Sequence, residues 1–225
     1  LGGSASSAIA APTLAAGTWV LRVAADGSVA GEMLAADLYG GAWHLAADGA
    51  RAIVTTGQNA QAEFHRLEGA SIVARSTLAN AYVTAVALDG ETIAALVQTQ
   101  NSGLDFGDGL ENGQTFVVTL DDALAVTGHG AMVAPIVPTA AVYGLTFDGG
   151  ALVALIGDAI VRLDDHLGVA ARTALPWAHQ VRVQSASPHD GGVAFLFQTI
   201  APLVEFDGLD IAGQGTRAIV DLDAP

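Results

Sequence analysis

The sequence of 225 residues contains no cysteine and no lysine, and only 14% of its residues are charged. Without cysteine it forms no disulfide and carries no thiolate nucleophile or thiolate metal ligand. A run of seventeen uncharged residues, "AMVAPIVPTAAVYGLTF", is interrupted by Pro135 and Pro138, and the N-terminal stretch has no basic segment followed by a compact apolar core. We therefore expect that the uncharged run does not span a membrane and that the N-terminal stretch is not a secretory signal peptide.

Basic residues are scarce as well. Eight arginines stand against 23 acidic residues, which gives a formal net charge of −15. Phosphate groups would be repelled by such a chain, so nucleic acids and anionic membrane surfaces are excluded as partners. A protein or a glycan is the expected partner class.

What the sequence has is a repeat. Four segments align on an Asp-Gly pair between apolar runs: "GAWHLAADGARAIVTTG", "YVTAVALDGETIAALVQ", "AVYGLTFDGGALVALIG" and "RVQSASPHDGGVAFLFQ". Their aspartates are spaced 41, 59 and 42 residues apart: Asp48, Asp89, Asp148 and Asp190. A second set of apolar runs with acidic turns lies between them, for example "AEFHRLEGASIVA" and "AIVRLDDHLGVAA". Asp-Gly between apolar runs is a strong hairpin signal, so each repeat predicts two hairpins, hence four antiparallel strands.

Four-stranded units at this period predict an all-β fold, a β-propeller of four-stranded antiparallel blades. Blades buried on both faces explain why the strands are almost continuously apolar. We expect about five blades, of which three are complete and two partial. Residues 1–17 are expected to be a linker or a partial strand, and 18–225 to be the propeller, with blades near 18–40, 41–79, 80–138, 140–178 and 180–225.

The segments "LAADGARAIV", "ALDGETIAALV" and "TFDGGALVALI", with the paired "RLEG" and "RLDD", resemble the repeats of bacterial secreted β-propeller proteins, loosely of the WD40-like type. The Trp-Asp and Gly-His signatures of true WD40 repeats are missing. The resemblance therefore implies a fold and a bacterial, extracytoplasmic location, and it transfers no catalytic residue.

Two repeats carry a long loop between their second and third strands. These loops are "QTQNSGLDFGDGLENGQT", residues 98–115, and "QTIAPLVEFDGLDIAGQGT", residues 198–216. In a blade, both loops leave from one end, here called the long-loop face, while the Asp-Gly turns lie at the other end, here called the turn face. Long loops on a rigid scaffold are the usual place for binding residues.

The acidic residues of the two loops are candidate calcium ligands, because hard cations take carboxylate and carbonyl oxygens from Gly-rich loops. The candidates are Asp105, Asp108, Glu111, Glu205, Asp207 and Asp210. Their spacing matches no EF-hand, and the alternative interpretation is that Asp and Gly simply form turns there. Calcium is the one possible cofactor, and otherwise none is expected.

A second candidate site is the long-loop mouth of the central channel, where the first strand of each blade begins. The residues expected there are Trp43, Tyr82, Tyr143 and Arg182. Aromatic rings at this mouth could stack on a sugar, whereas packing between blades explains the same residues with fewer assumptions. His65 and His166 are expected to be solvated or capping, and the arginines of the third strands, such as Arg66 and Arg162, to pair with turn carboxylates.

No catalytic motif is present: there is no nucleophile elbow, no zinc-binding helix pattern and no dinucleotide fingerprint. The sequence favours a non-catalytic binding or scaffolding module that uses the long-loop face. One alternative is a polysaccharide-acting hydrolase or lyase with acids at the channel mouth. A structural subunit of a larger assembly is another.

Overall fold

The computed structural model describes most of the chain. Outside the description are residues 1–17, 24–28, 36–41, 59–60, 70, 100–102, 108, 113–114, 133–142, 176, 178–179, 190–191, 207–208, 216 and 224–225. The described residues form 21 strands, β1 to β21, and no α-helix. In this part of the chain there is accordingly no helix that could cross a membrane.

Three sheets have four strands each, in chain order from one edge to the other. Blade II consists of β3 (Ala42–Asp48), β4 (Arg51–Gln58), β5 (Gln61–Glu68) and β6 (Ser71–Ala79). Blade III consists of β7 (Tyr82–Asp89), β8 (Thr92–Gln98), β11 (Thr115–Leu120) and β12 (Val126–Met132). Blade IV consists of β13 (Tyr143–Asp148), β14 (Ala151–Ile156), β15 (Ala159–Leu163) and β16 (Val169–Ala174).

Two further sheets are smaller. Blade I is the pair β1 (Thr18–Val23) and β2 (Val29–Ala35), and blade V joins β17 (Val181–His189), β18 (Gly192–Thr199) and β21 (Arg217–Asp223). Two short hairpins form separate two-stranded sheets. They are β9 (Gly103–Asp105) with β10 (Leu110–Asn112), and β19 (Leu203–Phe206) with β20 (Leu209–Ala212).

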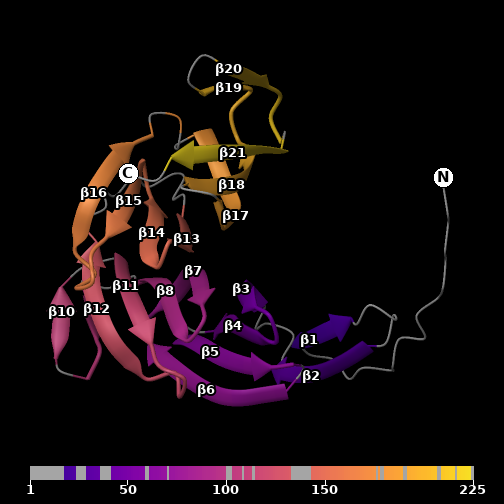
Figure 1. The fold of residues 1–225 in the computed structure, drawn as a ribbon, viewed down its shortest axis with the longest axis vertical. Coiled ribbons are helices and arrows are strands. Elements are labelled where there is room, and N and C mark those ends of the chain that lie inside the picture. The colour runs from indigo at the N-terminus through magenta and orange to yellow at the C-terminus, as the bar shows by residue number, and fades with distance from the viewer. Residues whose placement is uncertain are drawn as a thin grey trace.

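The blades follow one another around an arc, from blade I through blades II, III and IV to blade V (Figure 1). The first strands β3, β7, β13 and β17 contact each other in succession on the inside of the arc. The fourth strands β6, β12 and β16 lie on its outside. This radial stacking of four-stranded antiparallel sheets confirms the predicted β-propeller, with three complete and two partial blades.

Blade III shows why its strands are apolar on both faces. In β8 the five consecutive residues from Ile93 to Val97 are all fully buried. Ile93, Ala95 and Val97 pack in one cluster with Phe64 of blade II, while Ala94 and Leu96 pack with Leu145 and other residues of blade IV. Each large apolar side chain buried in this way contributes about 1.5–3 kcal/mol to the stability of the fold. A strand between two blades therefore has no solvent face that would call for polar residues.

The Asp-Gly pairs close the first hairpin of blades II, III and IV, as the sequence predicts. Asp48, for example, ends β3 opposite Arg51, and Gly49 then takes the first position of the turn with a φ of 59°. Gly90 and Gly149 occupy the same position with φ values of 54° and 55°. This left-handed backbone conformation costs glycine little, which explains the recurring Gly.

The turns between the third and fourth strands of blades III and IV are also alike. The Oδ1 atom of Asp121 accepts hydrogen bonds from the backbone N–H groups of the residues two and four positions later. The Oδ1 atom of Asp164 does the same. Three residues after each aspartate comes a leucine with positive φ, Leu124 at 64° and Leu167 at 61°. Both side chains are buried, Leu124 against blade II and Leu167 against blade III. The turn thus inserts a leucine between its own blade and the preceding one.

Candidate functional site

The first long loop forms a hairpin. Strands β9 and β10 pair antiparallel, with Asp105 opposite Leu110. The Oδ1 atom of Asp105 accepts hydrogen bonds from Gly107 N at 2.8 Å and from Gly109 N at 3.2 Å, and both glycines have positive φ. One oxygen of this candidate calcium ligand is therefore already occupied by the turn, which is the chemistry expected of Asp in a Gly-rich loop.

This hairpin packs back onto blade III. Leu104 is buried, and the ring of Phe106 stacks on the imidazole of His129 in β12, with ring centroids 4.3 Å apart. Phe106 also makes an edge-to-face contact with Phe116 of β11, with ring centroids 5.3 Å apart. Apolar and aromatic contacts of this kind fix the position of a loop in a way that solvated residues cannot. The loop is therefore a structured element.

Glu111 supports the same arrangement. Its Oε2 atom lies 2.6 Å from Nδ1 of His129, and both side chains are only partly exposed. The pair is an ion pair whenever the imidazole is protonated. Within this loop, Asp105 and Glu111 thus have partners inside the protein, while Asp108 lies outside the described residues.

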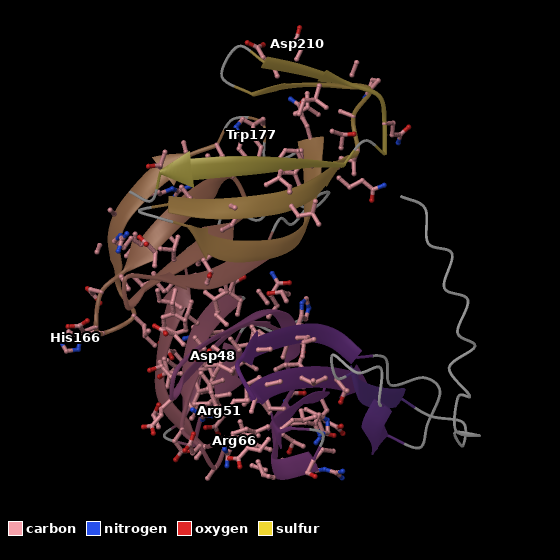
Figure 2. All side chains as sticks on the ribbon, turned by 45° about the vertical axis from the view of Figure 1, so that its right-hand side comes forward. Asp48, Arg51, Arg66, His166, Trp177 and Asp210 are labelled. Atoms are coloured by element: carbon pink, nitrogen blue, oxygen red, sulfur yellow. The ribbon has the colours of Figure 1, made fainter. Side chains whose placement is uncertain are left out.

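The second long loop also carries a hairpin, β19–β20, which projects from blade V with Asp210 near its tip (Figure 2). Glu205 faces Asp210 across the hairpin, and both are exposed. The buried Thr199 donates a hydrogen bond from Oγ1 to Gly213 O at 2.6 Å and so anchors the base of the loop. Asp207 lies outside the described residues.

The described carboxylates do not converge as a metal site. In the part of the chain that the structure describes, no three His, Asp or Glu side chains are placed to hold a metal ion together. Calcium binding by the two loops stays a prediction, because Asp108 and Asp207 lie outside that part.

The channel-mouth residues lie where the first strands begin. Tyr82 opens β7 opposite Gln98 and is 37% exposed. Trp43, Tyr143 and Arg182 stand at or next to the start of β3, β13 and β17, so their backbones lie at the same end of adjacent strands. The orientation of those three side chains is outside the description, and their role as a ligand site stays a prediction.

His65 corrects an expectation. It is only 3% exposed, and its Nε2 lies 3.0 Å from Thr56 Oγ1, which in turn donates to Glu63 Oε2 at 2.9 Å. Burial lowers the pKa of His65, against the opposing effect of Glu63. The prediction of a solvated or capping histidine was wrong for His65, because the third strand of blade II is buried on both faces; His166 is exposed.

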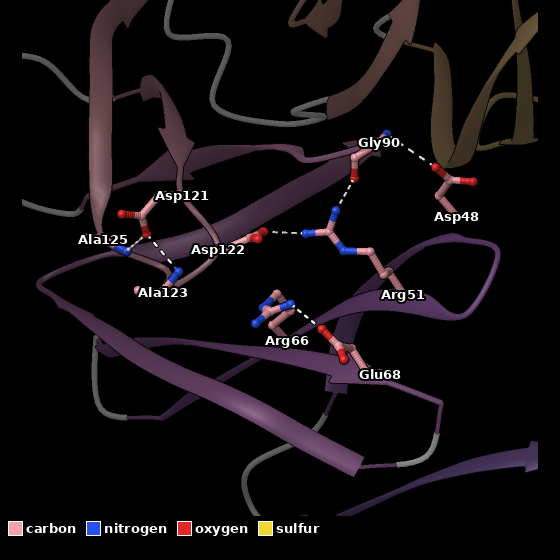
Figure 3. Close-up of polar contacts among 9 residues, drawn as sticks. All are labelled: Asp48, Arg51, Arg66, Glu68, Gly90, Asp121, Asp122, Ala123 and Ala125. Atoms are coloured by element: carbon pink, nitrogen blue, oxygen red, sulfur yellow. Dashed lines mark hydrogen bonds and ion pairs between the residues drawn. The ribbon is translucent and has the colours of Figure 1, made fainter.

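Arginines bind turn carboxylates on the turn face. Arg66 pairs with Glu68 at 2.7 Å and Arg162 with Asp148, which confirms the expectation for these two residues. Arg51 makes a contact that sequence reasoning missed, because its partners are distant in sequence. It donates to Gly90 O at 2.6 Å and to Asp122, both on blade III (Figure 3).

Blades II and III are joined at these turns from both sides. While Arg51 reaches across to blade III, Gly90 N donates back to Asp48 Oδ2 of blade II at 3.2 Å (Figure 3). On the turn face, carboxylates therefore neutralise Arg51 and Arg162.

The sequence matches no protein-family model and no curated protein sequence. Among solved structures, it is similar to a catalytically inactive virginiamycin B lyase from Staphylococcus aureus solved with quinupristin, with 12% identity and a TM-score of 0.54 over 91% of this chain. It is also similar to a protein of unknown function from Bacteroides caccae, with 8% identity and a TM-score of 0.52 over 88%. Myxococcus xanthus glutaminyl cyclase matches 72% of the chain with 16% identity and a TM-score of 0.48.

The chain covers 62% of the lyase and 66% of each of the other two structures. At these identities the likenesses concern the fold alone, and the fold hosts enzymes and other proteins alike. The likenesses to the lyase and to the Bacteroides caccae protein, with TM-scores above 0.5, therefore support the fold, and the function is argued from the site.

Proposed function

We propose that this protein is a non-catalytic binding or scaffolding module that engages a protein partner through the long-loop face. One observation carries the proposal: the hairpin β9–β10 is fixed to blade III through Leu104, Phe106 and Glu111, yet it presents Leu110 with 66% of its surface exposed. A rigid element that offers an apolar side chain loses little conformational entropy on binding.

Other exposed apolar side chains accompany Leu110 on this face. Tyr82 at the start of β7 and Ile200 at the start of the second loop are each 37% exposed. Aromatic and aliphatic anchors surrounded by polar residues are typical of protein interfaces. The acidic loops favour a partner with basic residues, since complementary charge speeds association.

The partners already held by Asp105 and Glu111 make these two loop carboxylates poor candidates for catalytic acids. A glycosidase needs two carboxyl groups that face the substrate, one of them free to exchange a proton with it. Asp105 accepts two backbone hydrogen bonds, and Glu111 lies against His129. We further propose a bacterial, extracytoplasmic location, on the resemblance to secreted propeller repeats.

Photo-crosslinking tests this function. A p-benzoylphenylalanine introduced at position 110 would sample the long-loop face, and the same residue at position 166 serves as the matched control, because His166 is equally an exposed loop residue but lies on the turn face. In an extract of the source cells, we expect one dominant protein adduct from position 110 and none from position 166. Equal labelling from both positions, or release of reducing sugars from a panel of polysaccharides by the unmodified protein, would contradict the proposal.

A further inference from the structure

The turn face contains a cavity that the proposed function does not use. Residues from the middle and second half of β3, β7 and β13 line an open cavity of about 480 Å³, where the first strands of blades II, III and IV meet. Cavities of roughly 300–1,000 Å³ are the usual size for small-molecule sites. This one lies at the opposite end of the first strands from Tyr82, so it is separate from the long-loop face.

The walls combine apolar side chains with backbone polar groups. Leu45, Leu88 and Leu145 are among the lining residues, and Leu45 is 65% exposed although it lies inside a strand. Each of the three strands has a single ladder partner among the described strands, because it is the edge of its sheet. An edge strand presents alternate N–H and C=O groups that another molecule can bind. The cavity therefore suits a ligand with an apolar body and at least one hydrogen-bonding group.

Charge decides which hydrogen-bonding group fits. Among the described residues that line the cavity, Asp89 alone carries a charged side chain, and it is exposed. Arg51 and Arg162, the arginines bound to nearby turns, are neutralised by Asp122 and Asp148. The chain as a whole carries a formal net charge of −15. A negative potential at a cavity mouth attracts cations and repels anions.

We propose that this cavity binds a small organic cation, an apolar group that carries an ammonium, with the ammonium at the carboxylate of Asp89 and the apolar body against Leu45 and Leu88. The Asp89 carboxylate accepts hydrogen bonds from the ammonium, and backbone carbonyl groups of the edge strands β3, β7 and β13 supply further acceptors.

Three probes that share one apolar body test the charge selection: phenethylamine, 2-phenylethanol and 3-phenylpropionate. Their affinities would be measured by NMR titration of the full chain at low salt. Because Asp89 is exposed, we expect the ammonium to bind about two- to fivefold more tightly than the alcohol, with the carboxylate weakest. Added salt at 0.5 M should reduce these differences, since it screens exposed charges. Equal affinity for all three probes, or no binding of the ammonium, would overturn the proposal.

The variant Asp89→Asn tests whether Asp89 is the residue that binds the ammonium. Asparagine is as acceptable as aspartate before a turn glycine, so the hairpin is retained. In this variant we expect the ammonium to bind no better than the alcohol. Asp165→Asn is the matched control, because it removes the same charge from an exposed turn residue outside the cavity lining, and it should leave all affinities unchanged. An equal loss in both variants would mean that net charge, rather than this site, attracts the cation, and would refute the assignment.

Leu45→Trp provides an independent check of the location. The larger ring at this exposed position should fill part of the cavity and weaken the ammonium and the alcohol alike, without unfolding the protein. Unchanged binding in this variant would contradict the site. Because the turn face is separate from position 110, failure of the cation proposal leaves the crosslinking test of the long-loop face unaffected.

Discussion

Replacing Gly130 by alanine should destabilise the contact between blades III and IV. A Cβ atom at position 130 would lie 2.8 Å from the carbonyl oxygen of Leu167 and 3.1 Å from its Cβ. Ordinary contact requires about half an ångström more, so the turn of blade IV would have to move. That turn resists movement because Asp164 Oδ1 holds two of its N–H groups, at 2.9 Å and 2.8 Å.

Gly130→Ala is expected to lower the free energy of unfolding by about 1–3 kcal/mol, the usual range for overpacking a tight contact. For a chain of this length, each kcal/mol lowers the melting temperature by about 2–4 °C, so Gly130→Ala should melt about 2–12 °C below the unmodified protein. Thermal melting and urea unfolding followed by tryptophan fluorescence would measure the effect, since Trp177 is buried against Phe197.

Gly128→Ala is the matched control on the same strand and the same face. Its new Cβ would meet the Thr119 hydroxyl at 2.9 Å, which belongs to a side chain of its own blade, and Leu167 Cδ1 only at 3.7 Å. A rotatable side chain yields more easily than a backbone carbonyl, so we expect a loss below about 1 kcal/mol. Equal melting temperatures for the two variants, or a Gly130→Ala protein as stable as the unmodified one, would refute the packing argument.

Three further predictions concern the core, pH and calcium. Leu124→Ala should lower the free energy of unfolding by about 2–5 kcal/mol in urea, because the leucine is buried between blades II and III. Leu110→Ala, at an exposed position, should change it by less than about 0.5 kcal/mol. Similar losses in the two variants would contradict the burial of Leu124. Burial lowers the pKa of His65, so the unfolded chain binds more protons and stability should fall as pH drops below about 6.5. His65→Gln should make the melting temperature less dependent on pH between about 6.5 and 5. A slope equal to that of the unmodified protein would disprove this. Because Asp105 and Glu111 already have partners, we expect calcium, compared with a chelator, to leave the melting temperature unchanged. A rise that is lost when Asp105, Asp108 and Asp207 become alanine would instead make the loops metal sites.

The fold was predictable because its signals are local. An Asp-Gly pair between apolar runs specifies a hairpin within a few residues, and Gly49, Gly90 and Gly149 take the positive φ that such turns require. The unbroken apolar run of β8 likewise follows from burial against two neighbouring blades.

The contacts of the candidate site were less predictable, because they join residues far apart in sequence. Nothing near Phe106 or Glu111 indicates that both would meet His129 of β12, 18 or more residues later. The pairing of Arg51 with Asp122 spans 71 residues. Packing between strands and blades, which the local pattern does not encode, decides these partners.

His65 shows a signal that was present and not used. In β5, residues 63 and 65 lie on one face of the strand, and Thr56 is directly opposite Glu63 in the ladder. A polar cluster of Thr56, Glu63 and His65 could have been inferred from that register. In β5, which is buried on both faces, Thr56 joins Glu63 and His65 Nε2, while Nδ1 of His65 has no hydrogen-bond partner among the described residues.

The central claim is that the first long loop is a folded platform rather than a solvated connection. Hydrogen exchange of the peptide 103–112, followed by mass spectrometry, tests it most directly. We expect slow exchange in the unmodified protein, because the hairpin is paired and docked through Phe106, and faster exchange in Phe106→Ala while blade II keeps its protection. Exchange of this peptide at the rate of an unstructured chain in the unmodified protein would contradict the account.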